Sequence, residues 1–416
     1  MKRKGLFVTI VVIFSFLVFL ATFVVIWFWG DTYSDMTDFK TGVEIPGLKE
    51  NAVPQGIANY YDGSSKQEYF FISAYMKKGP SRLYVTAANT GYVGYVTMKY
   101  LDPENDSADE NGYVDYYGHG GGVATNCKSG EKNGTLWLTL DNTKDPDKSE
   151  ILCAKRSSTD YTNIAEEVIK RAALEDGENV IKFDASFKAN CRASFLYFYK
   201  DANYTTNDRL YVGEFYRKGN YETAETHHVT TKNGIAQRAF VYEYQTSTSS
   251  DNKYGLTTIS DTSVPTESRV PKIRCIYSIP DKIQGFARTA SGDLVLSQSY
   301  GLPNSHLYYY KWNEVYTSTI ANKALFNTLG KKINFEYDGV FKNSGVKYTD
   351  SSLYVYFIDE SKLIRDYSIS SMSEGLCASG DRIYVLFESG SYKYRPFVRR
   401  RIENVQYFVP RSKSSN

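Results

Sequence analysis

The chain has 416 residues, 49 of them basic and 47 acidic, so its formal net charge is only +2. This balance provides no overall field that would favour nucleic acid or an anionic membrane surface. The 37 tyrosines and 23 phenylalanines, together with 30 glycines, are typical of aromatic-rich strands joined by polar turns. We therefore expect an all-β fold with little helix, in one large unit or in several smaller domains.

The N-terminal segment predicts a membrane anchor. Three basic residues, Lys2, Arg3 and Lys4, precede an uncharged apolar run at residues 6–29 that ends in three aromatic side chains and is long enough to cross a bilayer. By the positive-inside rule, residues 1–5 should lie in the cytoplasm and everything after the run outside the cell membrane. The alternative is a signal peptide that is removed, which would give a secreted protein.

After the anchor, we expect a stalk at residues 30–42, a folded body at residues 43–410 and a disordered tail at residues 411–416. The five cysteines cannot all pair internally, and Cys275 and Cys377 lie in apolar, strand-like segments, so buried thiols are expected. Cys127 with Cys153 is the one disulfide that we consider.

One phrase recurs along the body. It reads YSIPDKIQGF from Tyr277 and YSISSMSEGL from Tyr367. Weaker copies read PQGIA, HGGGVA and CRASF. The small residues that anchor the five copies are Gly56, Gly122, Ala193, Gly285 and Gly375.

Each anchor is followed by a turn and an alternating or aromatic strand, and then by a third and a fourth strand. Four strands per repeated unit predict a β-propeller with five blades, although residues 321–349 could hide a sixth. The first copy of the fourth strand, VEIP at residues 43–46, precedes the first anchor and should close the ring. One helical insert is expected at residues 162–177, with Asn163 and Glu166 as a capping box.

The anchors QGIA, QGFA and SEGL, each followed by an aliphatic and aromatic strand, resemble the NHL, gluconolactonase and strictosidine-synthase-like group of propellers. That resemblance implies a site at the mouth of the central channel, which the innermost strands line. Lactonases of the group bind a divalent cation with Glu, Asn and Asp side chains near the axis. Among the residues just before the anchors of this chain, only Glu374 has that chemistry, so a metal lactonase is not expected.

Polar residues before the anchors should converge on the channel from different blades. Glu374 is a candidate acid or base, with His119 and Glu214 as further candidates for catalysis. Arg192 can hold a carboxylate or phosphate through two hydrogen bonds. Gln55, Gln284 and Glu388 are candidate ligand-binding residues. The alternative is that these groups only bond neighbouring blades or channel water.

Two functions follow from these patterns. The first is a membrane-anchored module that binds a glycan, peptide or small polar ligand at the channel mouth. The second is an exported hydrolase, lactonase-like or a glycosidase, that uses Glu374 with His119, Arg192 or Glu214. The sequence leaves open whether the protein is an enzyme. We expect a monomer. We also expect no cofactor; calcium is the alternative, although the acidic loops at residues 102–112 and 141–150 match the calcium-binding template poorly.

Overall fold

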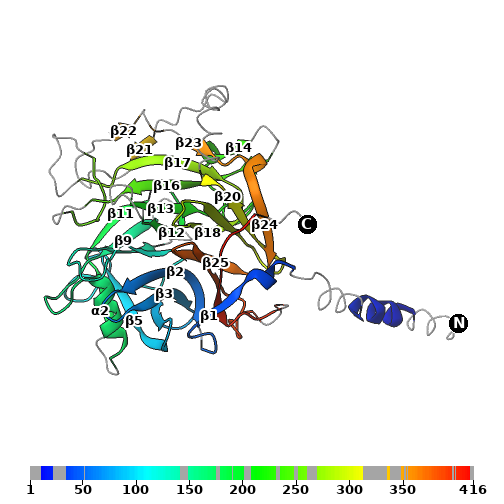
Figure 1. Ribbon diagram of the computed structural model, residues 1–416, viewed down its shortest axis with the longest axis horizontal. Coiled ribbons are helices and arrows are strands. Elements are labelled where there is room, and N and C mark those ends of the chain that lie inside the picture. The colour runs from blue at the N-terminus through cyan, green and yellow to red at the C-terminus, as the bar shows by residue number, and fades with distance from the viewer. Residues whose placement is uncertain are drawn as a thin grey trace.

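The computed structural model describes residues 11–21, 34–50, 52–140, 149–174, 179–189, 191–200, 208–230, 235–247, 252–259, 269–312, 335–337, 348–350, 353, 355–395, 398 and 400–412. These residues form a β-propeller of five four-stranded blades (Figure 1), which confirms the predicted fold and blade count. The blades follow one another along the chain, and the last one takes its outermost strand from the N-terminal side.

The strands of each blade are given from the channel outward. The first blade contains β2 (Ala52–Asp62), β3 (Gln67–Met76), β4 (Arg82–Ala87) and β5 (Gly91–Leu101). The second contains β7 (Val123–Thr125), β8 (Leu136–Leu140), β9 (Glu150–Ala154) and β11 (Ala185–Lys188). The third contains β12 (Ala193–Tyr199), β13 (Arg209–Glu214), β16 (Ala239–Gln245) and β17 (Ile273–Ile279).

The fourth blade contains β18 (Ile283–Arg288), β19 (Leu294–Gln298), β20 (Ser305–Tyr310) and β24 (Leu363–Ile369). The fifth contains β25 (Ser373–Ser379), β26 (Arg382–Phe387), β27 (Asn404–Phe408) and β1 (Lys40–Glu44). Strands within a blade are antiparallel, so the innermost and third strands run in one direction and the second and fourth strands in the other.

Short strands extend the outer edges of two blades. β10 (Val180–Phe183) pairs in parallel with β5, which also pairs with β6 (Tyr113–Asp115). β23 (Val355–Phe357) pairs in parallel with β17. Two small hairpins stand apart from the blades and consist of β14 (Val229–Thr230) with β15 (Ala236–Gln237), and β21 (Phe335–Tyr337) with β22 (Tyr348–Asp350). The described part of residues 321–349 therefore contains no sixth blade.

The N-terminal strand closes the ring, as predicted. β1 pairs with β27, with Lys40 opposite Tyr407 and Glu44 opposite Asn404, and lies beside the C-terminal part of the chain (Figure 1). β1 covers the edge of β27 and gives the fifth blade its fourth strand, so the two ends of the chain are joined in one sheet. Because β1 runs in the opposite direction to the innermost strand β25, Lys40 lies at the far end of the channel from the start of β25.

Part of the predicted stalk is packed against the propeller. The 3-10 helix η1 (Ser34–Asp38) places Asp35 within 2.9 Å of the Arg365 guanidinium of β24. Phe39 stacks on Phe408, with 4.5 Å between the ring centroids. The described body thus begins at Ser34, earlier than the predicted boundary at residue 43, and residues 30–33 lie outside the described residues.

At the C-terminus, the amide of Arg411 donates a hydrogen bond to the Tyr367 hydroxyl at 2.8 Å. The start of the predicted tail therefore contacts the body in the structure. Residues 413–416 lie outside the described residues.

The recurring small residues are explained by the close approach of neighbouring blades at the axis. The innermost strands contact one another in a closed ring, β2 to β7, β12, β18, β25 and back to β2. A Cβ atom on Gly285 would lie 2.8 Å from the carbonyl oxygen of Glu374 in the next blade. One on Gly375 would lie 3.0 Å from the backbone nitrogen of Ile57, across the closure of the ring. Glycine is needed at these positions because backbone faces backbone.

Farther from the axis, the space between blades is filled by large side chains. Tyr211 of β13 stacks on Phe286 of β18, with centroids 4.6 Å apart, and Trp137 stacks on Phe198 at 5.9 Å. All four side chains pack on strand faces, and Tyr211, Phe286 and Trp137 are fully buried. This packing accounts for the aromatic composition, since wedge-shaped gaps between twisted sheets need bulky residues.

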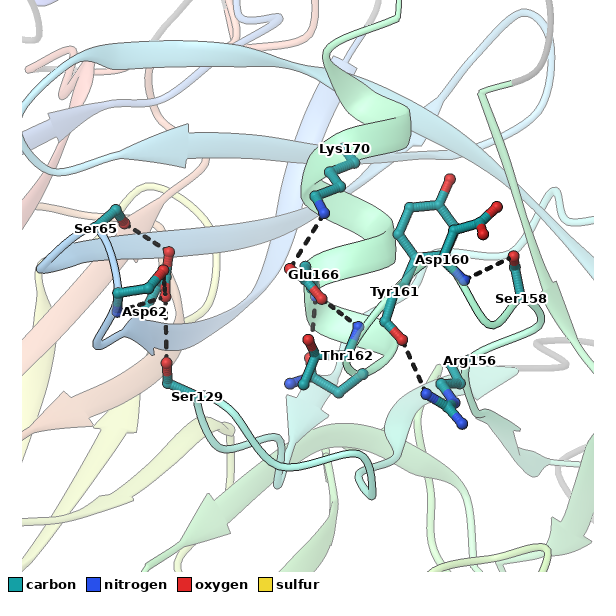
Figure 2. A network of polar contacts seen from close by, with 12 residues as sticks. Asp62, Ser65, Ser129, Arg156, Ser158, Asp160, Tyr161, Thr162, Glu166 and Lys170 are labelled. Carbon is teal, nitrogen blue, oxygen red and sulfur yellow. Dashed lines mark hydrogen bonds and ion pairs between the residues drawn. The ribbon is translucent and has the colours of Figure 1, made fainter.

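The predicted helical insert is α2 (Ile164–Ala172), which packs beside β5. The Asn163 side chain accepts a hydrogen bond from the Glu166 amide at 3.0 Å, as expected for an N-cap. The Glu166 carboxylate in turn accepts from the Thr162 amide and pairs with Lys170 (Figure 2). The predicted helix end at Gly177 lies outside the described residues.

All five cysteines are free thiols, and all except the half-buried Cys127 are buried. The disulfide considered between Cys127 and Cys153 is therefore wrong. Burial raises the pKa of the Cys127 thiol to about 11, which keeps it protonated and unreactive near neutral pH.

Residues 11–21 are helical, and their apolar side chains are exposed. In Figure 1 this helix lies apart from the propeller. None of the helices in the described part of the chain combines the length and the apolar character needed to cross a membrane. The remainder of the predicted anchor, residues 6–10 and 22–29, lies outside the described residues.

Candidate functional site

A cavity of about 550 Å³ opens at the end of the channel where the innermost strands begin. We call it the cup. All five blades contribute to its wall, which is lined by Val53, Gln55, Tyr75, Lys77, His119, Gly121, Ser194, Phe215, Tyr221, Gln284, Tyr300, Gly301, Met372, Glu374, Glu388, Tyr394 and Arg395. Its volume is within the usual range of about 300–1,000 Å³ for small-molecule sites.

The polar floor of the cup is built by β-bulges in the innermost strands. The ladder between β2 and β3 skips Gln55, and the ladder between β18 and β19 skips Gln284. In the fifth blade the ladder skips Glu374. A bulged residue leaves the regular pleat, so its side chain is re-aimed. The third blade has the same irregularity. Four blades therefore each turn one polar side chain toward a single cavity.

In the third blade the bulged residue is Ser194, because Ala193 pairs with Glu214 and Phe195 with Gly213. Phe195 thus occupies the position of the glycine anchors. Its ring fills the space that a Cβ atom on Gly213 would need. In this blade the required glycine is thus on the neighbouring strand β13. The predicted anchor Ala193 is therefore wrong. The anchor position of this blade is Phe195, so the residue before it that faces the cup is Ser194, not Arg192.

Two glutamates form a buried acid pair on the fifth-blade side of the cup. Glu388 is held by Arg395 through two contacts, Nε to Oε1 at 2.9 Å and Nη2 to Oε2 at 2.6 Å. Gln55 donates to the same carboxylate at 3.4 Å. Glu374 is only 8% exposed and shares a hydrogen bond with Glu388.

Burial raises the pKa of the Glu374 carboxyl well above its usual range, and the negative charge of Glu388 raises it further, while Arg395 acts in the opposite direction. Burial and the neighbouring carboxylate thus both favour the protonated form of Glu374. Arg395 is the cation that compensates the carboxylate of Glu388.

Aromatic rings gather on the side of the cup formed by the third and fourth blades. Phe215 contacts Tyr221 edge-on at 5.4 Å and Tyr300 at 6.4 Å between centroids. Two guanidinium groups lie against these rings. Arg217 is 4.0 Å from the centroid of Tyr300, and Arg192 is 4.4 Å from that of Tyr221. We call Phe215, Tyr221 and Tyr300 the aromatic side.

On the side formed by the first and fifth blades, the ammonium group of Lys77 lies 4.0 Å from the centroid of the Tyr394 ring. His119 lies against Tyr75, with 4.9 Å between ring centroids. Lys77 is exposed, whereas its neighbours on this wall are half-buried.

The structure brings five of the seven predicted residues to the cup, namely Gln55, His119, Gln284, Glu374 and Glu388. Arg192 lies outside its lining, behind Tyr221, where it also donates to the Asn220 carbonyl at 3.3 Å. Glu214 is also outside the lining. It is buried within the third blade, where it accepts from the Phe240 amide at 2.9 Å and contacts His227 Nδ1 at 2.9 Å.

Sequence reasoning missed the aromatic side, Lys77, Ser194 and Arg395. For several of them the sequence contains a signal, namely their position at the end of a predicted second strand. Second strands end beside the point where innermost strands begin, because the two are antiparallel. Tyr75, Phe215, Tyr300 and Glu388 all stand at or just beyond the ends of second strands. Of these, only Glu388 was selected from the sequence.

The predicted acidic loops show no arrangement of metal ligands in their described parts. In the loop at residues 102–112, Asp109 accepts from the Asn111 and Tyr113 amides and pairs with Lys99 at 3.0 Å. Residues 141–148 of the second loop lie outside the described residues. Within the described ranges there is no group of three His, Cys, Asp or Glu side chains arranged to hold a metal ion.

A second cavity of about 780 Å³ lies at the opposite end of the channel, where the innermost strands finish. It is lined by aromatic and small side chains such as Tyr61, Tyr199, Ala378 and Ser379, and by Arg288. None of the residues predicted for a site lies there, so the cup is the candidate functional site.

Comparison with known proteins gives no family assignment. No protein-family model matches the chain, and no curated protein sequence matches it either. Solved structures match weakly. The PQQ-bound aldose sugar dehydrogenase from Streptomyces coelicolor is 9% identical with a TM-score of 0.37, and the match covers 88% of this chain and 95% of that one.

The GH43_1 enzyme from Xanthomonas citri, complexed with xylose, is 10% identical with a TM-score of 0.38, over 90% of this chain and 92% of that one. The RS223 β-xylosidase is 8% identical with a TM-score of 0.37, over 89% and 94%. Similarity this low carries no argument about this chain. The class of protein, a five-bladed β-propeller, rests on the strand order described above, and the finer resemblance to the NHL group remains a prediction.

Proposed function

We propose that this protein is a binding module that holds a carbohydrate in the cup. The observation that carries the proposal is the pairing of an aromatic side, made of Phe215, Tyr221 and Tyr300, with a polar floor from separate blades. A sugar ring presents an apolar C–H face and a rim of hydroxyl groups, so it needs both surfaces at once. Aromatic rings supply large apolar area with few rotatable bonds.

The rings are held in place before any ligand arrives. Tyr221 is backed by Arg192 at 4.4 Å and Tyr300 by Arg217 at 4.0 Å, and both rings contact or lie near Phe215. Such cation–π contacts restrict the rings and lower the entropy lost on binding. Arg192 therefore has a supporting role in this proposal instead of the direct ligand contact predicted from the sequence.

The floor suits hydroxyl groups. Gln55 and Gln284 each offer an amide that donates and accepts, and the Ser194 hydroxyl does both. Gln284 already donates to the Ser299 carbonyl at 3.3 Å, which orients its amide. Three such groups from three blades can contact hydroxyls on different edges of one sugar.

The hydrolase alternative is less well supported. Carboxyl groups of glycosidases stand about 5–5.5 Å or about 6.5–9.5 Å apart, whereas Glu374 and Glu388 share a hydrogen bond. The predicted partner Glu214 is buried in the third blade and does not line the cup. We therefore favour binding without turnover, and release of a reducing end from a bound oligosaccharide would support the alternative instead.

The test is carbohydrate binding by the full chain and by Tyr300→Ala. Loss of one stacking ring should raise the dissociation constant about tenfold, which corresponds to roughly 1.4 kcal/mol of binding free energy. Tyr92→Ala is the matched control, because Tyr92 is also an exposed tyrosine but lies on β5 at the outer part of the first blade. Equal binding by the two variants, or no bound carbohydrate on a broad array, would contradict the proposal.

We also propose that residues 6–29 anchor the propeller in the cell membrane, with residues 1–5 inside. Support comes from the sequence of that segment, and from β1, which enters the propeller at the end of the channel opposite the cup. An anchor on that side would leave the cup facing away from the bilayer. The expected result is a full-length protein that stays in the membrane pellet after alkaline extraction. A soluble product whose N-terminus lies beyond residue 29 would contradict anchoring and indicate secretion.

A further inference from the structure

One basic side chain on the wall of the cup, Lys77, stands apart from the acid pair, on a different blade from the aromatic side. Besides its tyrosines, the cup is lined by five acidic or basic side chains: Lys77, His119, Glu374, Glu388 and Arg395. Glu388 is neutralised by Arg395 through contacts of 2.9 and 2.6 Å. Glu374 is buried beside Glu388 and Arg395, and burial raises its pKa well above the usual range.

Lys77 brings a positive charge to the wall of the cup. It stands just after the end of β3 and is exposed, with its ammonium group 4.0 Å from the centroid of the Tyr394 ring. Within the described part of the chain, no carboxylate forms an ion pair with it. The tyrosine face holds the ammonium group at the wall of the cup but leaves its N–H donors available to a ligand.

We propose that the carbohydrate bound in the cup is acidic, with its ring on the aromatic side and a uronic-acid carboxylate paired with Lys77. The inference rests on the proposed carbohydrate binding and names the class of sugar. The two features stand on different blades, the aromatic side on the third and fourth and Lys77 on the first, so one ligand that spans the cup contacts both. A neutral sugar would leave Lys77 without an anionic partner.

A carboxylate also fits the rest of the wall. The carboxylate of Glu388 is compensated, because Arg395 contacts both of its oxygens. A hydrogen bond between charged groups at a partly enclosed wall is stronger than one between neutral groups. We expect a preference of about tenfold for the acid over its neutral counterpart.

The experiment compares the full-length protein in detergent with Lys77→Met and Lys78→Met. The probes are an array of uronic-acid oligosaccharides, each printed beside the same oligosaccharide with its carboxyl groups reduced to alcohols. Methionine keeps most of the length of the side chain and removes its charge. Lys78 is exposed and adjacent but does not line the cup, so its variant controls for net charge.

The expected result is that the wild type and Lys78→Met bind the acidic oligosaccharides about tenfold more tightly than the reduced ones, and that Lys77→Met binds both alike. If the reduced forms bind as well as the acids, or if Lys77→Met keeps the full preference, the inference is overturned while carbohydrate binding stands. If neither form binds to the wild type, the proposed function itself fails, and the inference fails with it.

Discussion

At Glu374, ionisation of the carboxyl group costs free energy, because the group is buried beside a second glutamate. Its carboxyl group is 8% exposed, lies beside a second glutamate, and is turned into the cup by a bulge. A buried carboxyl next to a like charge keeps its proton, since the ionised form would lose hydration and meet repulsion. In its protonated form the residue can donate a hydrogen bond, as an amide does. Such perturbed groups are common at functional sites.

Replacement of this acid by its amide, Glu374→Gln, should change how stability depends on pH. The folded-state pKa of Glu374 is raised above its unfolded value, so its contribution to stability is full below the unfolded pKa of about 4.3 and is lost as the pH rises toward the folded pKa. The loss is at most about 1.4 kcal/mol per pH unit. Glutamine has no proton to release, so the variant should gain free energy of unfolding relative to the wild type between about pH 5 and pH 8.

Urea denaturation at about pH 5, 6.5 and 8 would measure this gain. The glutamine amide of the variant can still donate a hydrogen bond to Glu388, so the variant should fold and keep the geometry of the cup. A free-energy difference between the two proteins that stays constant over the three pH values would show that Glu374 is not the protonated group.

At the scale of the element, adjacent residues of the innermost strand shape the cup and allow close packing of the blades. Its bulge turns a polar side chain such as Gln284 into the cup, and the next residue, Gly285, lets the backbone of the neighbouring blade approach. The two features occur together in the first and fourth blades, where the bulged residue and the glycine are consecutive. The third blade achieves the same bulge with Phe195 against Gly213.

Gly285→Ala should therefore destabilise the protein by about 1–3 kcal/mol, the usual range for added volume in a packed site. The new Cβ atom would lie 2.8 Å from the Glu374 carbonyl oxygen, which belongs to backbone and cannot rotate away. Thermal unfolding would measure the effect. Gly63→Ala is the control, because its Cβ atom would meet only the Ser129 side chain, whose hydroxyl is 3.3 Å away; similar losses in both variants would contradict the role of close approach.

At the scale of the whole molecule, the ring depends on a strand that comes from the opposite end of the chain. β1 completes the fifth blade through β27, and η1 adds the ion pair between Asp35 and Arg365 at 2.9 Å. Without these residues, β27 becomes an exposed edge strand beside the first blade. Exposed edges favour local opening and aggregation.

Deletion of residues 1–44 should thus lower the unfolding midpoint and promote aggregation, whereas deletion of residues 1–33 should leave the propeller as stable as in the full chain. The comparison separates loss of β1 and η1 from loss of the apolar segment. Light scattering during a thermal ramp would follow both. Equal stability of the two truncated chains would show that closure by β1 is dispensable.

Much of the fold follows from the sequence because its signals are local. Alternating apolar residues, turn residues and the repeated anchors mark strands within a few positions of one another, and four such strands in a fixed order define a blade. The copy of the fourth strand that precedes the first anchor predicted ring closure by the same reasoning. The cap of α2 at Asn163 is equally local.

The site was decided by tertiary structure, since its members meet only through contacts between distant strands. Whether Arg192 or Ser194 faces the cup depends on a bulge that is set by pairing with β13, and Glu214 is drawn into the third blade by Phe240 and His227. The aromatic side and Lys77 come together because antiparallel second strands end where innermost strands begin. The sequence by itself determined a closed five-bladed propeller with polar residues near the channel; pairing register and burial determined which of them share one cavity.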